Sequence, residues 1–162
     1  MHLEKVKNVK RPRDADRPFP WRCRRCGQVA VGLTTISYEA QVRHEGRSHT
    51  FEVPRLQIPV CAKCEEKVFT VDVDDQINAA LRFHLHLLSP SEIGAALERL
   101  QLSPSELAER LGVDETLLGS WLDHVAIQSR AMDNLMRVYF TFPEVRTVLN
   151  GTSCCFAAIP SK

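Results

Sequence analysis

Two Cys-x-x-Cys pairs are the residues of this chain best suited to chemistry. Their members are Cys23, Cys26, Cys61 and Cys64, and 34 residues separate the first pair from the second. Two residues between thiolates let one tight turn aim both sulfurs at one ion, and two such turns complete a tetrahedral shell. The spacing therefore predicts a structural Zn²⁺ whose filled shell leaves no open position for a substrate.

Other uses of these cysteines remain open at this stage. Two disulfides or two redox-active pairs are one alternative, but no apolar signal stretch follows the basic start of the chain and no βαβ pattern surrounds the pairs. Iron is another, because a shell of four cysteines holds iron as well as zinc. The adjacent Cys154 and Cys155 lie outside the spacing and are interpreted as incidental.

The segment between the two pairs predicts a β-hairpin. Polar and apolar residues alternate on both sides of a Glu-Gly-Arg turn, with Tyr38, Ala40 and Val42 before it and Phe51 and Val53 after it. Pro54 and Pro59 cannot donate backbone hydrogen bonds, so the second strand is expected at a sheet edge or to end near them. A region this poor in large apolar residues gains stability from a metal, and Arg24, Arg25 and Lys63 offset the charge of four thiolates.

The residues after the second pair show helical periodicity. A first helix starts near Asp74, and two Ser-Pro-Ser-Glu sequences at Ser89 and Ser103 predict helix starts with capping boxes. Gly112 is expected to end the second of these helices in the left-handed conformation. Further helices are expected at about 115 to 124, 130 to 142 and 144 to 149.

These patterns predict an α+β fold in which a small Cys₄ zinc-bound β-hairpin domain precedes an all-α helix-turn-helix domain of about five helices. The expected parts are a flexible basic arm (1–22), the Cys₄ zinc-binding β domain (23–71), a linking helix (72–88), a repressor-like helix-turn-helix domain (89–149) and a C-terminal tail (150–162). The seven basic residues and three prolines of the arm leave it little to bury.

The helix-turn-helix prediction rests on the order Ala108, Gly112, Leu118, Trp121. The segment Leu107 to Val113 resembles the first half of the motif in the phage-repressor-like (XRE, Cro/CI) family, and Trp121 stands where that family often has an aromatic residue. A generic helical hairpin is the alternative. If the second helix docks as in repressors, Thr116 and Ser120 face the base edges of DNA.

Charge divides the chain in two. Residues 1–71 hold 14 Lys and Arg against 8 Asp and Glu, whereas residues 72–162 hold 7 against 12. Contacts with the phosphates of DNA are therefore expected from the first part, through Arg11, Arg13, Arg24 and Arg25. The stretch from Val113 to His124 has three acidic residues and no Lys or Arg, which favours a protein-interaction or dimerisation role for the helix-turn-helix as the alternative function.

The whole arrangement resembles MqsA-type (YgiT-like) antitoxins over about residues 23 to 149. The motif Cys61-Ala-Lys-Cys64-Glu65-Glu66 looks like the second metal-binding turn of that family. The resemblance implies a structural metal, a zinc domain that binds an mRNA-cleaving toxin protein, and a helical domain that forms a homodimer and binds operator DNA. We therefore expect an autoregulatory, toxin-neutralising, zinc-containing transcriptional regulator.

Two function classes are not expected. The sequence shows no nucleophile with an associated base, no phosphate-binding loop and no open metal site, so it does not predict an enzyme. No apolar run approaches the length of a membrane span, and the expected location is the cytoplasm.

Overall fold

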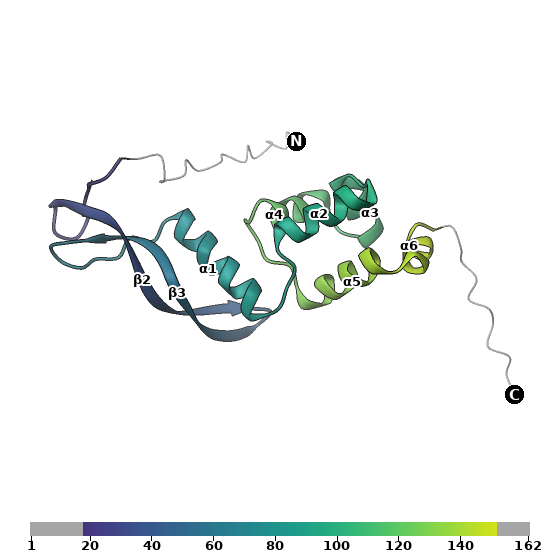
Figure 1. The fold of residues 1–162 in the computed structure, drawn as a ribbon, viewed down its shortest axis with the longest axis horizontal. Coiled ribbons are helices and arrows are strands. Elements are labelled where there is room, and N and C mark those ends of the chain that lie inside the picture. The colour runs from purple at the N-terminus through teal and green to yellow at the C-terminus, as the bar shows by residue number, and fades with distance from the viewer. Residues whose placement is uncertain (1–17, 152–162) are drawn as a thin grey trace, which may run out of the picture. The chain divides into compact units, whose positions relative to one another are not determined.

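The computed structural model describes residues 18–151, so Arg11 and Arg13 of the predicted arm and Cys154 and Cys155 of the predicted tail lie outside it. The fold is α+β, as expected: a three-stranded antiparallel sheet is followed by six helices in the described part of the chain (Figure 1). These residues divide into two compact units. The first, here called the metal unit, comprises 18–42 and 48–77, and the second, the helical unit, comprises 43–47 and 78–151.

The sheet consists of a long β-ribbon with a short third strand. Its strands are β1 (Trp21–Arg22), β2 (Val29–His44) and β3 (Arg47–Cys61), in the order β1-β2-β3. β1 pairs only with the start of β2, where Trp21 lies opposite Val31. Glu45 and Gly46 form the two-residue loop between β2 and β3 with φ angles of 47° and 78°, as a type I′ turn requires. The predicted hairpin turn is confirmed.

β3 is the edge strand that its prolines indicated, but it does not end at them. The buried residues are Phe51 and Val53 before Pro54, and Leu56 and Ile58 after it, so the alternation shifts by one residue at Pro54–Arg55. Such a one-residue irregularity lets an edge strand continue past a residue that cannot donate. β3 therefore reaches Cys61 and carries the second Cys pair at its end.

α1 (Val71–His84) begins beside β3. Val73 and Ile77 are buried, and the side-chain amide of Gln76 is hydrogen-bonded to the backbone of Gln57 on β3. The expected linking helix over 72–88 ends four residues early. His86 has a φ of 52°, which an α-helix does not allow, so the chain turns there before α2.

Five further helices form the helical unit, as predicted. They are α2 (Pro90–Leu100), α3 (Pro104–Leu111), α4 (Glu115–Leu122), α5 (Arg130–Thr141) and α6 (Pro143–Leu149). Ser89 and Ser103 cap α2 and α3 in complete capping boxes with Glu92 and Glu106, and Gly112 ends α3 with a φ of 67°. The local signals in the sequence were therefore sufficient to locate these ends.

A hydrophobic core holds the described helices α2 to α5 together. Twelve buried residues form it: Leu88, Ile93, Ala96, Leu97, Leu107, Ala108, Leu111, Leu118, Trp121, Met136, Tyr139 and Phe140. A buried carboxylate adds polar contacts, because Asp133 accepts hydrogen bonds from the Leu88 N–H at 2.6 Å, Gln128 Nε2 at 3.1 Å and Arg137 Nε at 2.7 Å. Asp133 thus joins α5 to the segment that leads into α2.

The start of α5 receives a second long-range contact. The Glu45 carboxylate of the hairpin loop accepts a hydrogen bond from the Arg130 N–H at 3.1 Å, and the Arg130 guanidinium donates to the carbonyls of Leu85 and His86. An acidic side chain at a helix N-terminus is favourable because free N–H groups and the helix dipole lie there. No helix between residues 18 and 151 has the length and apolar character that crossing a membrane demands.

Candidate metal centre

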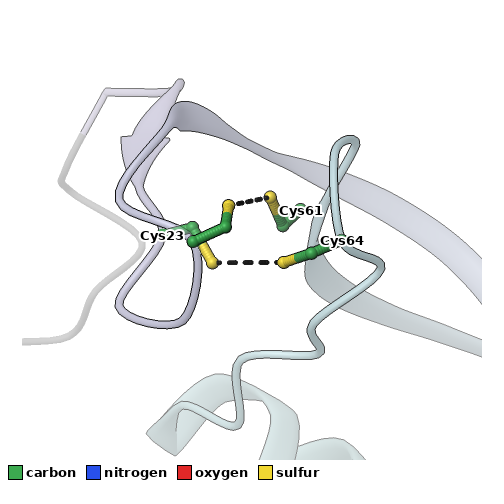
Figure 2. A group of neighbouring side chains, drawn as sticks. Cys23, Cys61 and Cys64 are labelled. Atoms are coloured by element: carbon green, nitrogen blue, oxygen red, sulfur yellow. Dashed lines mark hydrogen bonds between the residues drawn. The ribbon is translucent and has the colours of Figure 1, made fainter.

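The four predicted cysteines come together in the metal unit. Their Sγ atoms all lie within 4.8 Å of one another. The Sγ atoms of Cys23 and Cys64 lie 3.6 Å apart, as do those of Cys26 and Cys61, so each of these pairs joins the two halves of the cluster (Figure 2). The two turns that supply the sulfurs, residues 23–28 and 61–66, are called the first and second knuckle below.

The two knuckles have the same backbone geometry. The Gly27 N–H donates to the Cys23 carbonyl at 2.9 Å, and the Glu65 N–H donates to the Cys61 carbonyl at 2.8 Å. Gly27 and Glu65, which each follow the second cysteine of their knuckle, have φ angles of 74° and 59°. The chain therefore repeats one ligand-presenting turn, once at the end of β1 and once at the end of β3.

The donor set fits a tetrahedral metal ion. Four thiolates at the Zn–S bond length of about 2.3 Å place their sulfurs about 3.8 Å apart, close to the separations observed. A disulfide needs sulfurs about 2.05 Å apart, and all four cysteines are free thiols in the structure. The cluster is thus arranged for one ion held by both knuckles, and its geometry suits zinc and iron alike.

The pKa values within the cluster reflect how close its four sulfurs lie to one another. The Lys63 N–H helps to stabilise the Cys61 thiolate and lowers the pKa of Cys61 to about 7. The Glu66 N–H lowers the pKa of Cys64, but burial and the neighbouring thiols of Cys26, Cys23 and Cys61 outweigh it and raise that pKa to about 12. Four thiolates this close would repel one another, and a cation bound between them would relieve that repulsion and replace the protons.

A small apolar cluster surrounds the sulfurs. Trp21 and Val31 pack against Cys23 and Cys61, and the ring of Phe19 stacks on Trp21 with centroids 4.4 Å apart. Both Trp21 and Val31 are buried. Their apolar side chains limit the access of water to the sulfur atoms, which favours retention of a metal.

The two basic residues predicted at the first knuckle, Arg24 and Arg25, differ in their surroundings. Arg25 reaches across to the second knuckle, where its Nη1 lies 3.0 Å from Glu66 Oε2, and this hydrogen bond and the charge of Glu66 raise the pKa of Arg25. Arg24 is exposed. Arg24 is therefore better placed than Arg25 for a phosphate contact, because Arg25 must first leave Glu66.

Thr116 and Ser120 lie on α4 of the helical unit. The Thr116 hydroxyl donates to the Asp114 carboxylate at 2.5 Å, and the Ser120 hydroxyl donates to the Leu117 carbonyl at 2.6 Å. Both hydroxyl donors are therefore used within α4. Their oxygens keep lone pairs that can accept a hydrogen bond from a base amino group.

Sequence reasoning missed three long-range contacts. These are the Glu45 cap of α5, the buried Asp133 and the hydrogen bonds of Gln76 to β3. A partial signal existed for Asp133, because Arg137 follows it at the i,i+4 spacing of a helical ion pair. Nothing in the local sequence marked Glu45 or Gln76, since their partners lie 85 and 19 residues away.

Comparison with protein-family models and with curated proteins gives no match to this chain. The likeness to MqsA-type antitoxins therefore rests on the motifs themselves.

Proposed function

We propose that the chain is a metal-stabilised DNA-binding transcriptional regulator of the repressor-like helix-turn-helix class, similar in organisation to MqsA-type antitoxins. The observation that supports this proposal most directly is the geometry of α3 and α4. Gly112 ends α3 in the left-handed conformation, and Asp114 caps α4, which begins at Glu115. This two-helix arrangement with a short glycine-containing turn resembles the DNA-binding motif of repressors, which supports the proposal.

The packing supports a motif with one buried and one exposed face. Leu107 and Ala108 of α3 and Leu118 and Trp121 of α4 are buried in the same core. Glu115 and Thr116 are exposed at the start of α4, where repressors contact bases. In this proposal Thr116 and Ser120 accept hydrogen bonds from base amino groups, which are donors of cytosine and adenine.

The metal has a structural role in this proposal. Cys23, Cys26, Cys61 and Cys64 hold one Zn²⁺, which fixes the two knuckles relative to each other. Arg11, Arg13, Arg24 and Arg25 supply phosphate contacts that the acidic helical part does not provide. By its likeness to antitoxins, the protein binds its own promoter as a homodimer and binds a toxin protein through the metal unit.

The test is binding of the full chain to a labelled fragment of its own promoter at 50 and 200 mM salt. Several phosphate contacts predict that affinity falls by about 10²-fold or more between these concentrations. Replacing Arg11, Arg13 and Arg24 by Gln should flatten that salt dependence, whereas Thr116→Ala with Ser120→Ala should reduce the preference over competitor DNA. Absence of binding at both salt concentrations would overturn the proposal.

A second candidate function, a protein-binding helix-turn-helix, is favoured by one observation. α4 carries no Lys or Arg, and the arginines of α5 and α6 (Arg130, Arg137 and Arg146) bond to carbonyl or carboxylate groups of their own unit. Leu117 on α4 is 42% exposed. A photo-crosslinking residue at position 117 that labels protein and never DNA in cells would select this function over the first.

A further inference from the structure

The two outer edges of the β2–β3 ribbon differ in how they are covered. Along β3, the Gln76 side chain accepts from the Gln57 N–H and donates to the Gln57 carbonyl, both at 2.9 Å. The Pro59 carbonyl accepts from the Val68 N–H at 2.9 Å, and Pro54 has no N–H to offer. Prolines and side chains that occupy backbone groups are established ways of closing a sheet edge to other strands.

The outer edge of β2 has no strand partner over most of its length in the described part of the chain. β1 pairs with β2 only as far as Val31, and no other strand between residues 18 and 151 lies on that side. From Gly32 to Arg43 the strand contains no Pro and no Lys. An uncovered edge of this length is a template for pairing with a further strand.

The hairpin loop determines which residues present their backbone groups to this edge. In a two-residue hairpin the flanking residues, here His44 and Arg47, face each other and exchange hydrogen bonds across the ladder. Alternate residues then point the other way, so Glu39, Gln41 and Arg43 offer N–H and C=O groups to the free edge. All three residues are exposed, so the edge is accessible at each of them.

Two opposite charges are placed symmetrically on this edge. Glu39 and Arg43 lie two residues before and two residues after Gln41, and their side chains share a face of the strand because residues two apart do so. We propose that the β2 edges of two copies of this chain pair antiparallel around Gln41. Glu39 of each copy then lies opposite Arg43 of the other, and the sheets of both copies become continuous.

The sequence of this edge favours a second copy of the chain as the strand that pairs with it. Two-fold symmetry places Gln41 opposite Gln41 as a hydrogen-bonded pair, so donors and acceptors match without a change of register. Opposite charges directly across a strand pair stabilise it, and in this register no like charges oppose each other. A strand from another protein would have to reproduce the same charge order in reverse. This inference concerns self-association and does not depend on DNA binding.

The test measures the dimerisation constant of the full, metal-loaded chain by sedimentation equilibrium. Glu39→Lys and Arg43→Glu should each weaken the dimer about tenfold, because each change turns two attractions per dimer into two repulsions. The double variant Glu39→Lys with Arg43→Glu exchanges the charges and should restore the affinity. The matched control Arg55→Glu, a charge reversal at an exposed position of β3, should leave it unchanged.

Gln41→Pro tests the backbone contact independently of charge. It removes the N–H that faces the free edge and leaves the bonds between β2 and β3, so metal content and circular dichroism should stay the same while the dimer is lost. A wild-type chain that is monomeric at all concentrations overturns the proposal. A dimer that tolerates Gln41→Pro, or single variants that the double variant does not rescue, overturns it as well.

Discussion

The knuckle region and the helical unit are stabilised by different means. Among residues 18–151, four are buried together around the sulfurs, Trp21, Cys23, Val31 and Cys61, and two of these are cysteines of the cluster. The helical unit buries twelve residues in one core and has side-chain caps at the starts of α2 to α5. A region with so little apolar surface to bury is of the kind that recruits a metal for stability, whereas the helical unit has a hydrophobic core of its own.

Replacing one cysteine of the cluster should have the largest effect, and that effect should fall on the metal unit. Cys26→Ser removes one ligand from a site whose metal contributes about 10 to 16 kcal/mol in comparable small domains. We expect the metal content to fall to background and the β signal in circular dichroism to decrease, with the helical signal largely kept. Cys155→Ser is the matched control and should keep full metal content. A variant Cys26→Ser that retains stoichiometric metal would contradict the account.

Loss of a core side chain should have the next largest effect, confined to the other unit. Trp121 is 3% exposed in the helical core, so Trp121→Ala should reduce the free energy of unfolding of the helical unit by about 3 to 5 kcal/mol. Urea denaturation followed by helical circular dichroism measures this change. Leu117→Ala on the exposed side of α4 serves as control. A loss for Trp121→Ala within about 0.5 kcal/mol would place Trp121 outside the core.

Removal of a helix cap should have a smaller, pH-dependent effect. The hydrogen bonds from Ser103 to the Glu106 carboxylate, first from the backbone N–H and then from the hydroxyl, lower the pKa of Glu106. A carboxyl whose pKa is lowered on folding adds stability above its unfolded value of about 4.3, and this stability disappears as the pH falls through the lower folded value.

Ser103→Ala should therefore cost about 1 kcal/mol at neutral pH and less below about pH 4. Thermal unfolding of the helical unit between pH 3 and 7 measures the difference. Thr141→Ala, which removes an exposed hydroxyl at the C-terminal end of α5 and no helix cap, is the control. Equal losses at both ends of the pH range would show that Glu106 takes no part in the capping box.

The smallest expected effect comes from substitutions at the equivalent positions of the two knuckles, Gly27 and Glu65. Glu65 holds the left-handed conformation that Gly27 holds in the first knuckle, and a residue with a Cβ adopts it at a cost of about 1 kcal/mol. Glu65→Gly should stabilise the metal unit by up to about 1 kcal/mol, and Gly27→Ala should destabilise it by a similar amount. Thermal unfolding of the metal-loaded chain would show two shifts of opposite sign. Shifts of the same sign would contradict the equivalence of the knuckles.

The features predicted correctly from the sequence are those with local causes. The cysteine spacing located the cluster of four cysteines, the Ser-Pro-Ser-Glu sequences located two helix starts, and the Glu45–Gly46 loop followed from its turn residues. Each of these signals lies within a few residues of its effect. The type of metal that the cluster would hold has no local signature, because four cysteines at this spacing suit zinc and iron.

The features that were missed depend on residues far apart in the chain. The linking helix ends at His84 and not at 88, because the following segment is fixed by Arg130 and Asp133 of α5. β3 continues past Pro54 because the irregularity there is compatible with an edge strand. The hydrogen bonds of Gln76 to the edge of β3 depend on the position of α1 beside that strand. The sequence pattern does not specify that position.

The two tryptophans allow the most direct test of the central claim, because Trp21 lies in the metal unit and Trp121 in the helical unit. Trp121→Phe leaves Trp21 as the sole tryptophan, and Trp21→Phe leaves Trp121. Fluorescence is recorded while a chelator removes the metal under reducing conditions and while Zn²⁺ is added back. The account predicts that Trp21 emission shifts to the red and recovers with Zn²⁺, whereas Trp121 emission stays constant. Metal removal without any change in Trp21 emission would contradict it.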